Sequence, residues 1–294
     1  MPHPSRDDAT LRAALHGVRG LLLDLDGVLV LAGKAIPGAP EALAELDRRG
    51  MPYLVVTNTS LVSRGSLARW GRSVGFATPP DRFQSALSAS AELVRRELGD
   101  RPVYVISSAD ALAEFEGLNV VDGAAVDAAP GDVAAVILGD SPDQLTKANL
   151  DRAFRLVRGG AALIGMHRNP WWITPEGPTL DAGSFLVALE WATKRRARTV
   201  GKPSPAFFRV AIARLAAEAA ARGEPRLGAR DLAMVGDDVG SDIAGARRIG
   251  LRTIFVRTGK HGEAELAAAA GRARGAVRPD AVAASIVEVV AALD

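Results

Sequence analysis

The chain has 294 residues, of which 48% are hydrophobic, and its 36 basic and 34 acidic side chains leave a formal net charge of +2. A chain of this size can bury one or two cores, which predicts one or two domains. The charge balance gives no reason to expect nucleic-acid binding, and the lack of cysteine excludes disulfides, thiolate metal sites and cysteine nucleophiles.

The N-terminal segment and the hydropathy give expectations about location. Residues 1–20 are polar and mixed in charge, unlike a signal peptide. No apolar run approaches the roughly 20 residues needed to span a membrane. We therefore expect a soluble, cytoplasmic protein with no membrane partner.

The first apolar segment, residues 21–30 (LLLDLDGVLV), predicts a buried strand. Asp24 and Asp26 lie two positions apart, so a regular strand would point both carboxylates to one face, and Gly27 would let the backbone turn. Two like charges are costly in a dry core, which points to a cation or a reaction that uses them. For these residues alone, a strand that simply ends in a polar, turn-forming DxDG is the alternative.

The segments that follow alternate between helix and strand. We expect a loop at residues 31–40 and then a helix at 39–49. A strand at 53–60 and a second helix at 63–74 are expected to follow. Gly50 predicts a helix C-cap and Ser63 a helix N-cap. This alternation is typical of a parallel sheet whose faces are covered by helices.

The pattern restarts near residue 85. Helices are expected at residues 86–98 and 145–158, and strands at 103–107, 133–138 and 161–166. A loop-rich stretch is expected at 117–131. Residues 169–178 (NPWWITPEGP) are rich in proline and glycine and predict a loop. We therefore expect a second domain at 85–180, inserted into a first domain made of 1–84 and 181–294.

The last part of the chain returns to the first pattern. Helices are expected at 184–194 and 205–222, strands at 232–235 and 253–256, and a final helix from 280 to the end. Lys202 lies in a Gly-Lys-Pro turn before the second of these helices. The strand at 232–235 runs into the acidic segment GDDVGSD at 236–242.

Polar side chains gather where three of the expected strands end: Asp24 and Asp26, Thr57 and Asn58, and Asp237, Asp238 and Asp242. Ligands bind at the carboxyl ends of the strands in open parallel sheets, so we expect these groups to meet there with Lys202. Hard oxygen ligands suit Mg²⁺ rather than zinc. A cation, a lysine and backbone N–H groups form a receptor for a phosphoryl group, and a carboxylate in line with it can act as a nucleophile.

Four segments, in order, resemble the motifs of the haloacid dehalogenase superfamily: DLDG at 24–27, VTNTS at 56–60, GKPSP at 201–205 and GDDVGSD at 236–242. The stretch between the second and third motifs resembles the large cap of subfamily IIA, which includes N-acetylglucosamine-phosphate, 4-nitrophenyl-phosphate and pyridoxal-phosphate phosphatases. Residues 180–208 and the VRTGK at 256–260 are most similar to the branch of the phospholysine phosphohistidine inorganic pyrophosphate phosphatases.

The resemblance implies an α/β fold, with a doubly wound parallel sheet and a smaller inserted α/β cap. It implies that Asp24 attacks phosphorus and forms an aspartyl-phosphate, and that Asp26 protonates the leaving oxygen and then activates water. Lys202 would neutralise charge on both nucleophile and phosphate. Mg²⁺ would be held by Asp24, the Asp26 carbonyl and Asp237, with Asp242 supporting the metal through water or pairing with Lys202. Thr57 and the Asn58 amide would hold phosphoryl oxygens.

The resemblance also implies a small phosphorylated substrate and suggests a homodimer through the cap. Asp26 stands where some relatives in the pyrophosphate branch carry Ser, which keeps ordinary phosphomonoesters open as substrates. The sequence does not choose among several possible substrates: sugar phosphates, nucleotides, pyridoxal phosphate, phosphoglycolate, pyrophosphate and phosphoramidates. The alternatives are a 2-haloacid dehalogenase-type hydrolase and a non-catalytic phospholigand-binding regulatory protein; the acidic cluster and the large cap weigh against the first, and intact Asp24, Asp26, Lys202 and Asp237 against the second.

Three further features have two interpretations each. Trp171 and Trp172 fit the lining of a substrate pocket and a packed interface equally well. His167 is expected to be a polar loop residue rather than a base. The basic segment KRRAR at 194–198 is expected to be a solvated helix C-terminus rather than a nucleic-acid site.

Overall fold

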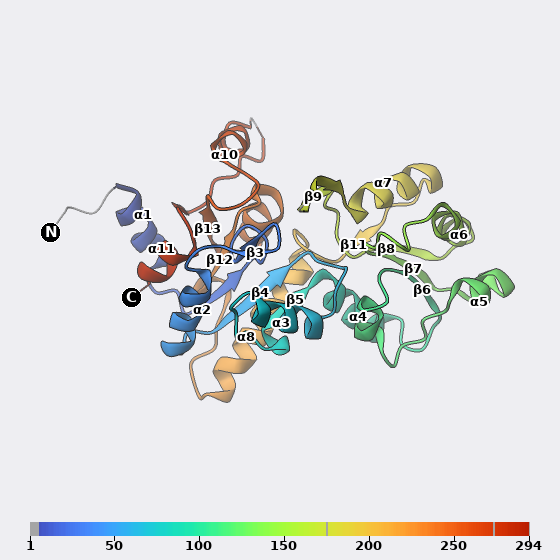
Figure 1. The fold of residues 1–294 in the computed structure, drawn as a ribbon, viewed down its shortest axis with the longest axis horizontal. Helices are drawn as coiled ribbons and strands as arrows, with labels where there is room; N and C mark the ends of the chain where they lie inside the picture. The colour runs from blue at the N-terminus through green and yellow to red at the C-terminus, as the bar shows by residue number, and fades with distance from the viewer. Residues whose placement is uncertain (1–5, 175, 273, 294) are drawn as a thin grey trace. The chain divides into compact units, whose positions relative to one another are not determined.

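The computed structural model describes residues 6–174, 176–272 and 274–293 (Figure 1). Within them, the chain forms two compact units. The first consists of residues up to 57, 68–84 and those from 202 onward, and the second of 58–67 and 85–201. Each unit is built on a parallel sheet with helices packed against it, so the predicted α/β fold class is confirmed.

A six-stranded sheet with the order β14–β13–β12–β1–β4–β5 forms the centre of the first unit. Its strands are β1 (Gly20–Leu23), β4 (Tyr53–Thr57), β5 (Phe83–Ser85), β12 (Leu232–Gly236), β13 (Arg252–Val256) and β14 (Ala281–Ala283). β1 pairs in parallel with both neighbours, with Leu21 opposite Ala233 on one side and Tyr53 on the other. All residues of β1, β4 and β12 are buried, as expected for a sheet covered on both faces.

The helices around this sheet were predicted only in part: those at 39–48, 64–73 and 205–221 lie within one residue of the expected ranges, and those at 6–15 and 263–270 were not expected. They are α1 (Arg6–Leu15), α2 (Ala39–Arg48), α3 (Arg64–Ser73), α8 (Pro205–Ala221), α9 (Gly245–Arg247), α10 (Glu263–Ala270) and α11 (Ile286–Ala291). Two predicted caps are confirmed. Gly50 takes a φ of 64° after α2 and donates its N–H to the Asp47 carbonyl, and the Ser63 hydroxyl accepts the Ser66 N–H at the start of α3.

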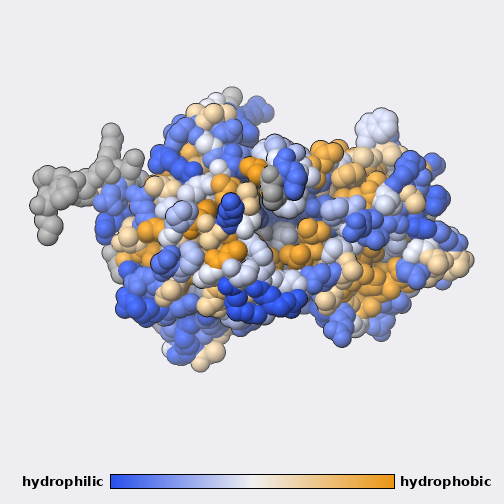
Figure 2. Space-filling model, in the orientation of Figure 1, coloured by the Kyte–Doolittle hydropathy of each residue, from blue (hydrophilic) through white to orange (hydrophobic). Residues whose placement is uncertain are grey.

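The second unit has a four-stranded parallel sheet with the order β11–β8–β7–β6. Its main elements are α4 (Ala86–Glu97), β6 (Val103–Ile106), α5 (Gly123–Ala128), β7 (Ala135–Leu138), α6 (Lys147–Arg158), β8 (Ala162–Gly165), α7 (Ala182–Thr193) and β11 (Arg198–Thr199). Alternate strand residues face two separate apolar clusters, with Ile164 in one and Leu163 in the other. Figure 2 shows hydrophobic side chains gathered on the visible face of this unit, between the positions of α4 and α5.

The first strand is shorter than predicted. β1 ends at Leu23, and the next residues turn, with Gly27 at a φ of 85° donating its N–H to the Val30 carbonyl at 2.6 Å. The expected loop at 31–40 begins with a small antiparallel hairpin of β2 (Val30–Leu31) and β3 (Lys34–Ala35). The turn expected at Gly27 is therefore confirmed, but the strand expected within 21–30 ends before Asp24 and Asp26 rather than carrying both at its far end.

Two other segments form strands that the sequence did not predict. The expected loop at 169–178 contains β9 (Trp171–Thr174), which pairs antiparallel with β10 (Gly177–Leu180); Pro175 lies outside the described residues. Trp, Ile and Thr favour strands, and this preference outweighs the nearby Pro and Gly. The expected final helix begins only at Ile286, because β14 adds to the sheet edge beside β13.

The second unit extends further along the chain than the expected boundary at residue 180. α7 and β11 belong to it, since β11 pairs with Ile164 and Gly165 of β8. The expected loop-rich stretch at 117–131 also contains α5. Among the described residues, no helix combines the length and the apolar character that crossing a membrane requires.

Candidate active site

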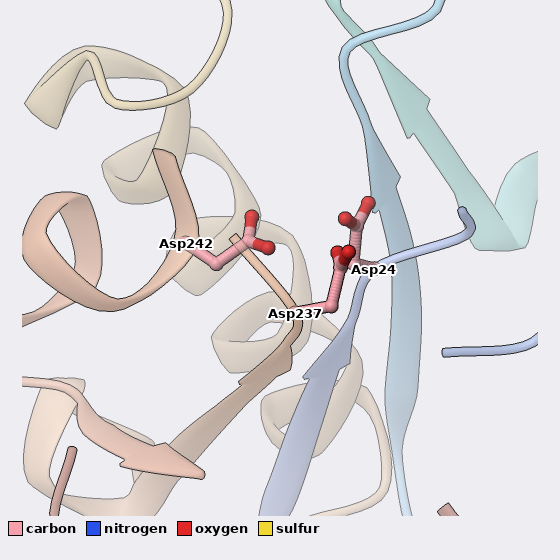
Figure 3. A group of neighbouring side chains, drawn as sticks. All are labelled: Asp24, Asp237 and Asp242. Carbon is pink, nitrogen blue, oxygen red and sulfur yellow. The ribbon is translucent and has the colours of Figure 1, made fainter. Parts of the chain in front are cut away.

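Three carboxylates from separate segments of the first unit converge (Figure 3). Asp24 directly follows β1, Asp237 directly follows β12, and Asp242 lies in the short π-helical segment η5 (Val239–Ala244). All three are buried, and one oxygen of each lies within 4.8 Å of the others. The parallel pairing of β1 with β12 brings Asp24 and Asp237 to the same edge of the sheet.

Lys202 lies between two of these carboxylates. Its Nζ is 2.6 Å from Asp24 Oδ1 and 2.8 Å from Asp242 Oδ1, and the residue is 2% exposed. Burial alone would lower the pKa of Lys202, but the adjacent Asp24 and Asp242 carboxylates raise it above its usual value. The lysine is therefore a buried ammonium group that compensates two acidic neighbours.

The other site residues predicted from the sequence occupy different positions. Asp26 is exposed and is not part of the buried carboxylate group, because the strand ends before it and no longer fixes which way its side chain points. Thr57 is the buried last residue of β4. Asn58 begins the second unit, where its side-chain amide donates a hydrogen bond to Asn169 Oδ1 at 3.1 Å.

Lys260 was missed as a site residue by reasoning from the sequence. It follows β13, and its backbone N–H donates to Asp237 Oδ2 at 2.7 Å. Its Nζ lies 2.9 Å from Asp238 Oδ2. The Gly-Lys pair after the β13 strand was the available signal, because it lies at the same carboxyl edge as the acidic segments.

The Asp238 carboxylate contacts backbone N–H groups and a lysine rather than the three buried carboxylates. It accepts the N–H groups of Gly240 and Ser241, both at 2.8 Å, in addition to the Lys260 ammonium group. Burial would raise the pKa of Asp238, but Lys260 and the Ser241 N–H lower it well below its usual range. Asp238 therefore caps η5 and lies outside the carboxylate group formed by Asp24, Asp237 and Asp242.

The buried carboxylates fit a hard divalent cation. Burial raises the pKa of Asp24 to about 6, although Lys202 opposes the shift. Burial and their acidic neighbours raise the pKa of Asp237 and of Asp242 to about 7. Lys202 pairs with Asp24 and Asp242, and Lys260 pairs with Asp238, so two lysines face four carboxylates here. Oxygen ligands of this kind suit Mg²⁺.

Glycines leave room for these carboxylates. A Cβ at Gly259 would lie 2.0 Å from Asp237 Oδ2, and a Cβ at Gly236 would lie 2.3 Å from Asp242 Oδ2. The backbone therefore approaches both carboxylates so closely that a larger residue at either glycine would displace them.

Comparison with known proteins identifies the family. Residues 21–121 match the family described as haloacid dehalogenase-like hydrolase, and residues 199–289 match a HAD-hydrolase-like family. The chain is 33% identical over 252 residues to human haloacid dehalogenase-like hydrolase domain-containing protein 2, covering 85% of this chain and 88% of that protein. The chain belongs to the haloacid dehalogenase-like hydrolase family.

Further relatives within this family carry more specific names. The phospholysine phosphohistidine inorganic pyrophosphate phosphatase of Xenopus laevis is 32% identical over 258 residues, covering 85% of this chain and 87% of that protein. The p-nitrophenyl phosphatase from Archaeoglobus fulgidus superposes with a TM-score of 0.81 at 28% identity, covering 94% of this chain and 99% of that chain. A magnesium complex of glycerol phosphate phosphatase from Mycobacterium tuberculosis superposes with a TM-score of 0.77 at 25% identity, covering 94% of this chain and 77% of that chain.

The second unit of this haloacid dehalogenase-like hydrolase has its own buried polar cluster. His167 lies in the segment after β8, as expected, and its Nε2 is 3.0 Å from Ser60 Oγ and 3.4 Å from Asp181 Oδ1. The hydroxyl and the carboxylate contact the same ring nitrogen, whereas a Ser-His-Asp triad places them on opposite nitrogens. This cluster is therefore not arranged as a hydrolytic triad.

We expect Gly259→Ala to reduce the activity of this hydrolase by about 100-fold, because misplacing a reacting group by about an ångström can cost that much. The new Cβ would overlap the Asp237 carboxylate and push it from its position. Steady-state kinetics over a Mg²⁺ titration measures the effect. Gly262→Ala in the same loop is the matched control, since its Cβ would have no neighbour closer than 3.8 Å. Equal activity in the two variants would contradict this role for Gly259.

We expect the metal-free hydrolase to lose stability as the pH rises from about 4 to about 7. In the folded chain Asp24 holds its proton to about pH 6 and Asp237 and Asp242 to about pH 7, against an ordinary value of 3.8. The folded state then binds more protons than the unfolded state across this range, so each pH increase favours unfolding. Urea unfolding in EDTA between pH 5 and 8 measures this, and Asp237→Asn should flatten the curve. Stability that rises across this range would contradict the prediction.

Proposed function

We propose that this hydrolase is a Mg²⁺-dependent phosphatase that cleaves a small phosphorylated metabolite through an aspartyl-phosphate intermediate. The observation that carries the proposal is the buried Asp24 carboxylate, paired at 2.6 Å with the buried Lys202 ammonium beside two further buried carboxylates. The names of the pyrophosphate, p-nitrophenyl and glycerol phosphate phosphatases among its relatives support the same reaction class.

Asp24 is the proposed nucleophile, and its two oxygens have different surroundings. Lys202 and the Leu25 N–H both bind Oδ1, at 2.6 and 2.8 Å, which supports Oδ2 as the proposed attacking oxygen. Lys202 neutralises charge on the nucleophile and on the phosphoryl group. Phosphoryl transfer depends chiefly on such positioning and charge stabilisation.

Asp26 is the proposed general acid and base. It donates a proton to the leaving oxygen in the first step and accepts one from the water that hydrolyses the aspartyl-phosphate in the second. Its exposure is compatible with reaching a substrate and solvent. Thr57 and the Asn58 amide are proposed to hold the phosphoryl oxygens.

The proposed Mg²⁺ ligands are Asp24, the Asp26 carbonyl, Asp237 and Asp242. When bound, the ion would supply positive charge to the phosphoryl oxygens. Asp242 already pairs with Lys202 at 2.8 Å, which supports its role in positioning the lysine as well.

The second unit is proposed as the cap that selects the substrate, with Trp171 and Trp172 of β9 as candidate contacts. Val187 and Trp191 on α7 are 46% and 74% exposed, which supports a homodimer through this unit. The proposed substrate is a small molecule in the cytoplasm, with no nucleic-acid or membrane partner.

The test is phosphate release from sugar phosphates, nucleotides, pyridoxal phosphate, phosphoglycolate and pyrophosphate, with Mg²⁺ and with EDTA. We expect release that EDTA abolishes. Metal-dependent binding of these compounds without release would contradict the proposal and favour a regulatory binding protein.

Asp26→Asn should slow the hydrolysis of alkyl phosphates by about 100-fold or more, since their leaving groups need a proton donor. It should leave a single-turnover burst of 4-nitrophenol from 4-nitrophenyl phosphate, whose phenolate leaves unaided. Equal slowing of the burst and of alkyl phosphates would exclude Asp26 as the acid.

A further inference from the structure

The segment 58–60, which follows β4, is held at both ends by hydrogen bonds from other parts of the second unit. At its first residue, the Asn58 side-chain amide donates to Asn169 Oδ1 at 3.1 Å. At its last residue, the Ser60 carbonyl accepts a hydrogen bond from the Ser107 hydroxyl at 2.7 Å. Asn58 and Ser60 are both buried, so water does not readily replace a hydrogen bond that is lost there.

His167, in the segment after β8, connects the two ends of segment 58–60. Its Nδ1 lies 3.3 Å from the backbone nitrogen of Asn169, and its Nε2 lies 3.0 Å from Ser60 Oγ. A backbone N–H can only donate, so Nδ1 is the acceptor and the proton of the neutral ring is on Nε2. Nε2 can therefore donate to Ser60 Oγ while Nδ1 holds the Asn169 backbone.

The start of α7 fixes His167 and Asn169 in turn. Asp181 Oδ1 lies 3.4 Å from His167 Nε2, and the same oxygen caps α7 by accepting the Ala182 N–H at 2.7 Å. The Gly183 N–H, in the first turn of the helix, donates to the Asn169 carbonyl at 3.1 Å. The histidine and the asparagine are thus attached to one rigid element of the second unit.

The Ser60 hydroxyl is also fixed from two sides. Its oxygen lies 2.8 Å from the Asp140 backbone nitrogen, whose N–H it accepts, and 3.0 Å from His167 Nε2. A hydroxyl oxygen has two lone pairs, so these two donors use both of them. The Ser60 side chain therefore cannot turn away without losing both hydrogen bonds.

We propose that His167 is a positioning residue for segment 58–60, with Nε2 holding Ser60 and Nδ1 holding the Asn58 side chain through Asn169. This inference rests on the proposed function, in which Asn58 contacts phosphoryl oxygens. His167 touches no reacting atom in this role. It keeps the phosphoryl-binding segment in one conformation, so the buried cluster of Ser60, His167 and Asp181 serves substrate binding rather than covalent catalysis.

The test compares wild type with His167→Phe, which keeps a ring but removes both nitrogens. We expect the KM for 4-nitrophenyl phosphate to rise by about tenfold or more, as expected for hydrogen bonds lost at a binding segment. The Kd of inorganic phosphate, from isothermal titration with Mg²⁺, should rise by a similar factor, while kcat should change by less than about threefold. A merely structural role would lower the folded fraction and hence kcat, and would leave KM and Kd unchanged.

Further variants separate hydrogen bonding from packing. His167→Asn can place an acceptor near the position of Nδ1, and His167→Gln can place a donor near that of Nε2. Each should recover part of the phosphate affinity that His167→Phe loses. Asn169→Ala should weaken phosphate binding in wild type and have no further effect in an Asn58→Ala background, where the bond between the two side chains is already absent.

Tyr104→Phe is the matched control. It also removes a polar group from a buried aromatic side chain of the second unit, and the Tyr104 hydroxyl donates to Asn149 Oδ1 at 3.0 Å rather than to segment 58–60. It should leave KM and the phosphate Kd unchanged. Thermal unfolding establishes that each variant is folded, and if His167→Phe does not fold, the Asn, Gln and Asn169→Ala variants decide the result.

The inference and the proposed function can fail separately. The inference alone is overturned if wild type binds or releases phosphate and His167→Phe keeps the same KM and Kd. It is also overturned if Tyr104→Phe weakens phosphate binding equally, or if neither His167→Asn nor His167→Gln recovers affinity. A wild-type chain that neither releases nor binds phosphate would overturn the proposed function and this inference together.

Discussion

We expect Asp24→Asn to lose at least about a thousandfold in phosphate release, as is typical when a catalytic nucleophile is removed. The amide has the shape of the carboxylate but no charged oxygen to attack phosphorus. The fold should persist, because the substitution removes one of three crowded, buried carboxylates whose charged forms burial disfavours. Phosphate release with Mg²⁺, on the best substrate of the wild type, measures the loss.

Asp132→Asn is the control for this experiment, since Asp132 is an exposed aspartate of the second unit and is not a member of the carboxylate group. It should behave as wild type. Unchanged release by Asp24→Asn would remove Asp24 as the nucleophile and with it the aspartyl-phosphate mechanism. Brief incubation with labelled substrate and acid quenching gives a second readout, because label should attach to the wild-type chain and not to the variant.

The second large effect is expected from Lys202→Met. Removing one partner from a buried ion pair typically costs about 3–5 kcal/mol of stability, because it leaves the other charge uncompensated. Here the loss affects two buried carboxylates, Asp24 and Asp242, both within 3 Å of the ammonium. Urea unfolding in EDTA at pH 8 measures the loss, and the difference from wild type should shrink toward pH 5, where the carboxylates gain protons.

Lys147→Met is the matched control, because Lys147 also pairs with an aspartate, Asp151, but on an exposed helix surface. Exposed pairs contribute little to stability, so its unfolding curve should stay close to wild type. Similar unfolding midpoints for the two lysine variants would contradict the role assigned to Lys202. Lys202→Arg keeps the charge and should lie between wild type and Lys202→Met.

The carboxylate group was predictable from the sequence because each member lies next to an uninterrupted apolar run. Asp24 follows GLLL and Asp237 follows LAMVG, and runs of this kind become buried parallel strands. The rule that ligands gather at the carboxyl edge of such strands then places both aspartates together without any knowledge of the contacts. The same local reasoning gave the helix caps at Gly50 and Ser63.

Other features depend on distant partners and could not be derived locally. The orientation of Asp26 depends on the glycine turn after β1. Strand periodicity alone predicted that its carboxylate would lie on the same face as that of Asp24. The role of Lys260 depends on which loop packs beside Asp237. The extent of the second unit depends on β11, whose two residues become a strand only because β8 offers them an edge.

The parallel pairing of β1 with β12 also has a consequence for the order in which the protein can form during synthesis. The paired residues, such as Gly20 and Leu232, are roughly 200 positions apart, and such distant pairings form slowly because a long loop must close first. On the ribosome, β1 can pair with β4 early, but its other side has no partner until the second unit and then β12 have been made. The second unit is complete by residue 201 and can fold before β12 has been made.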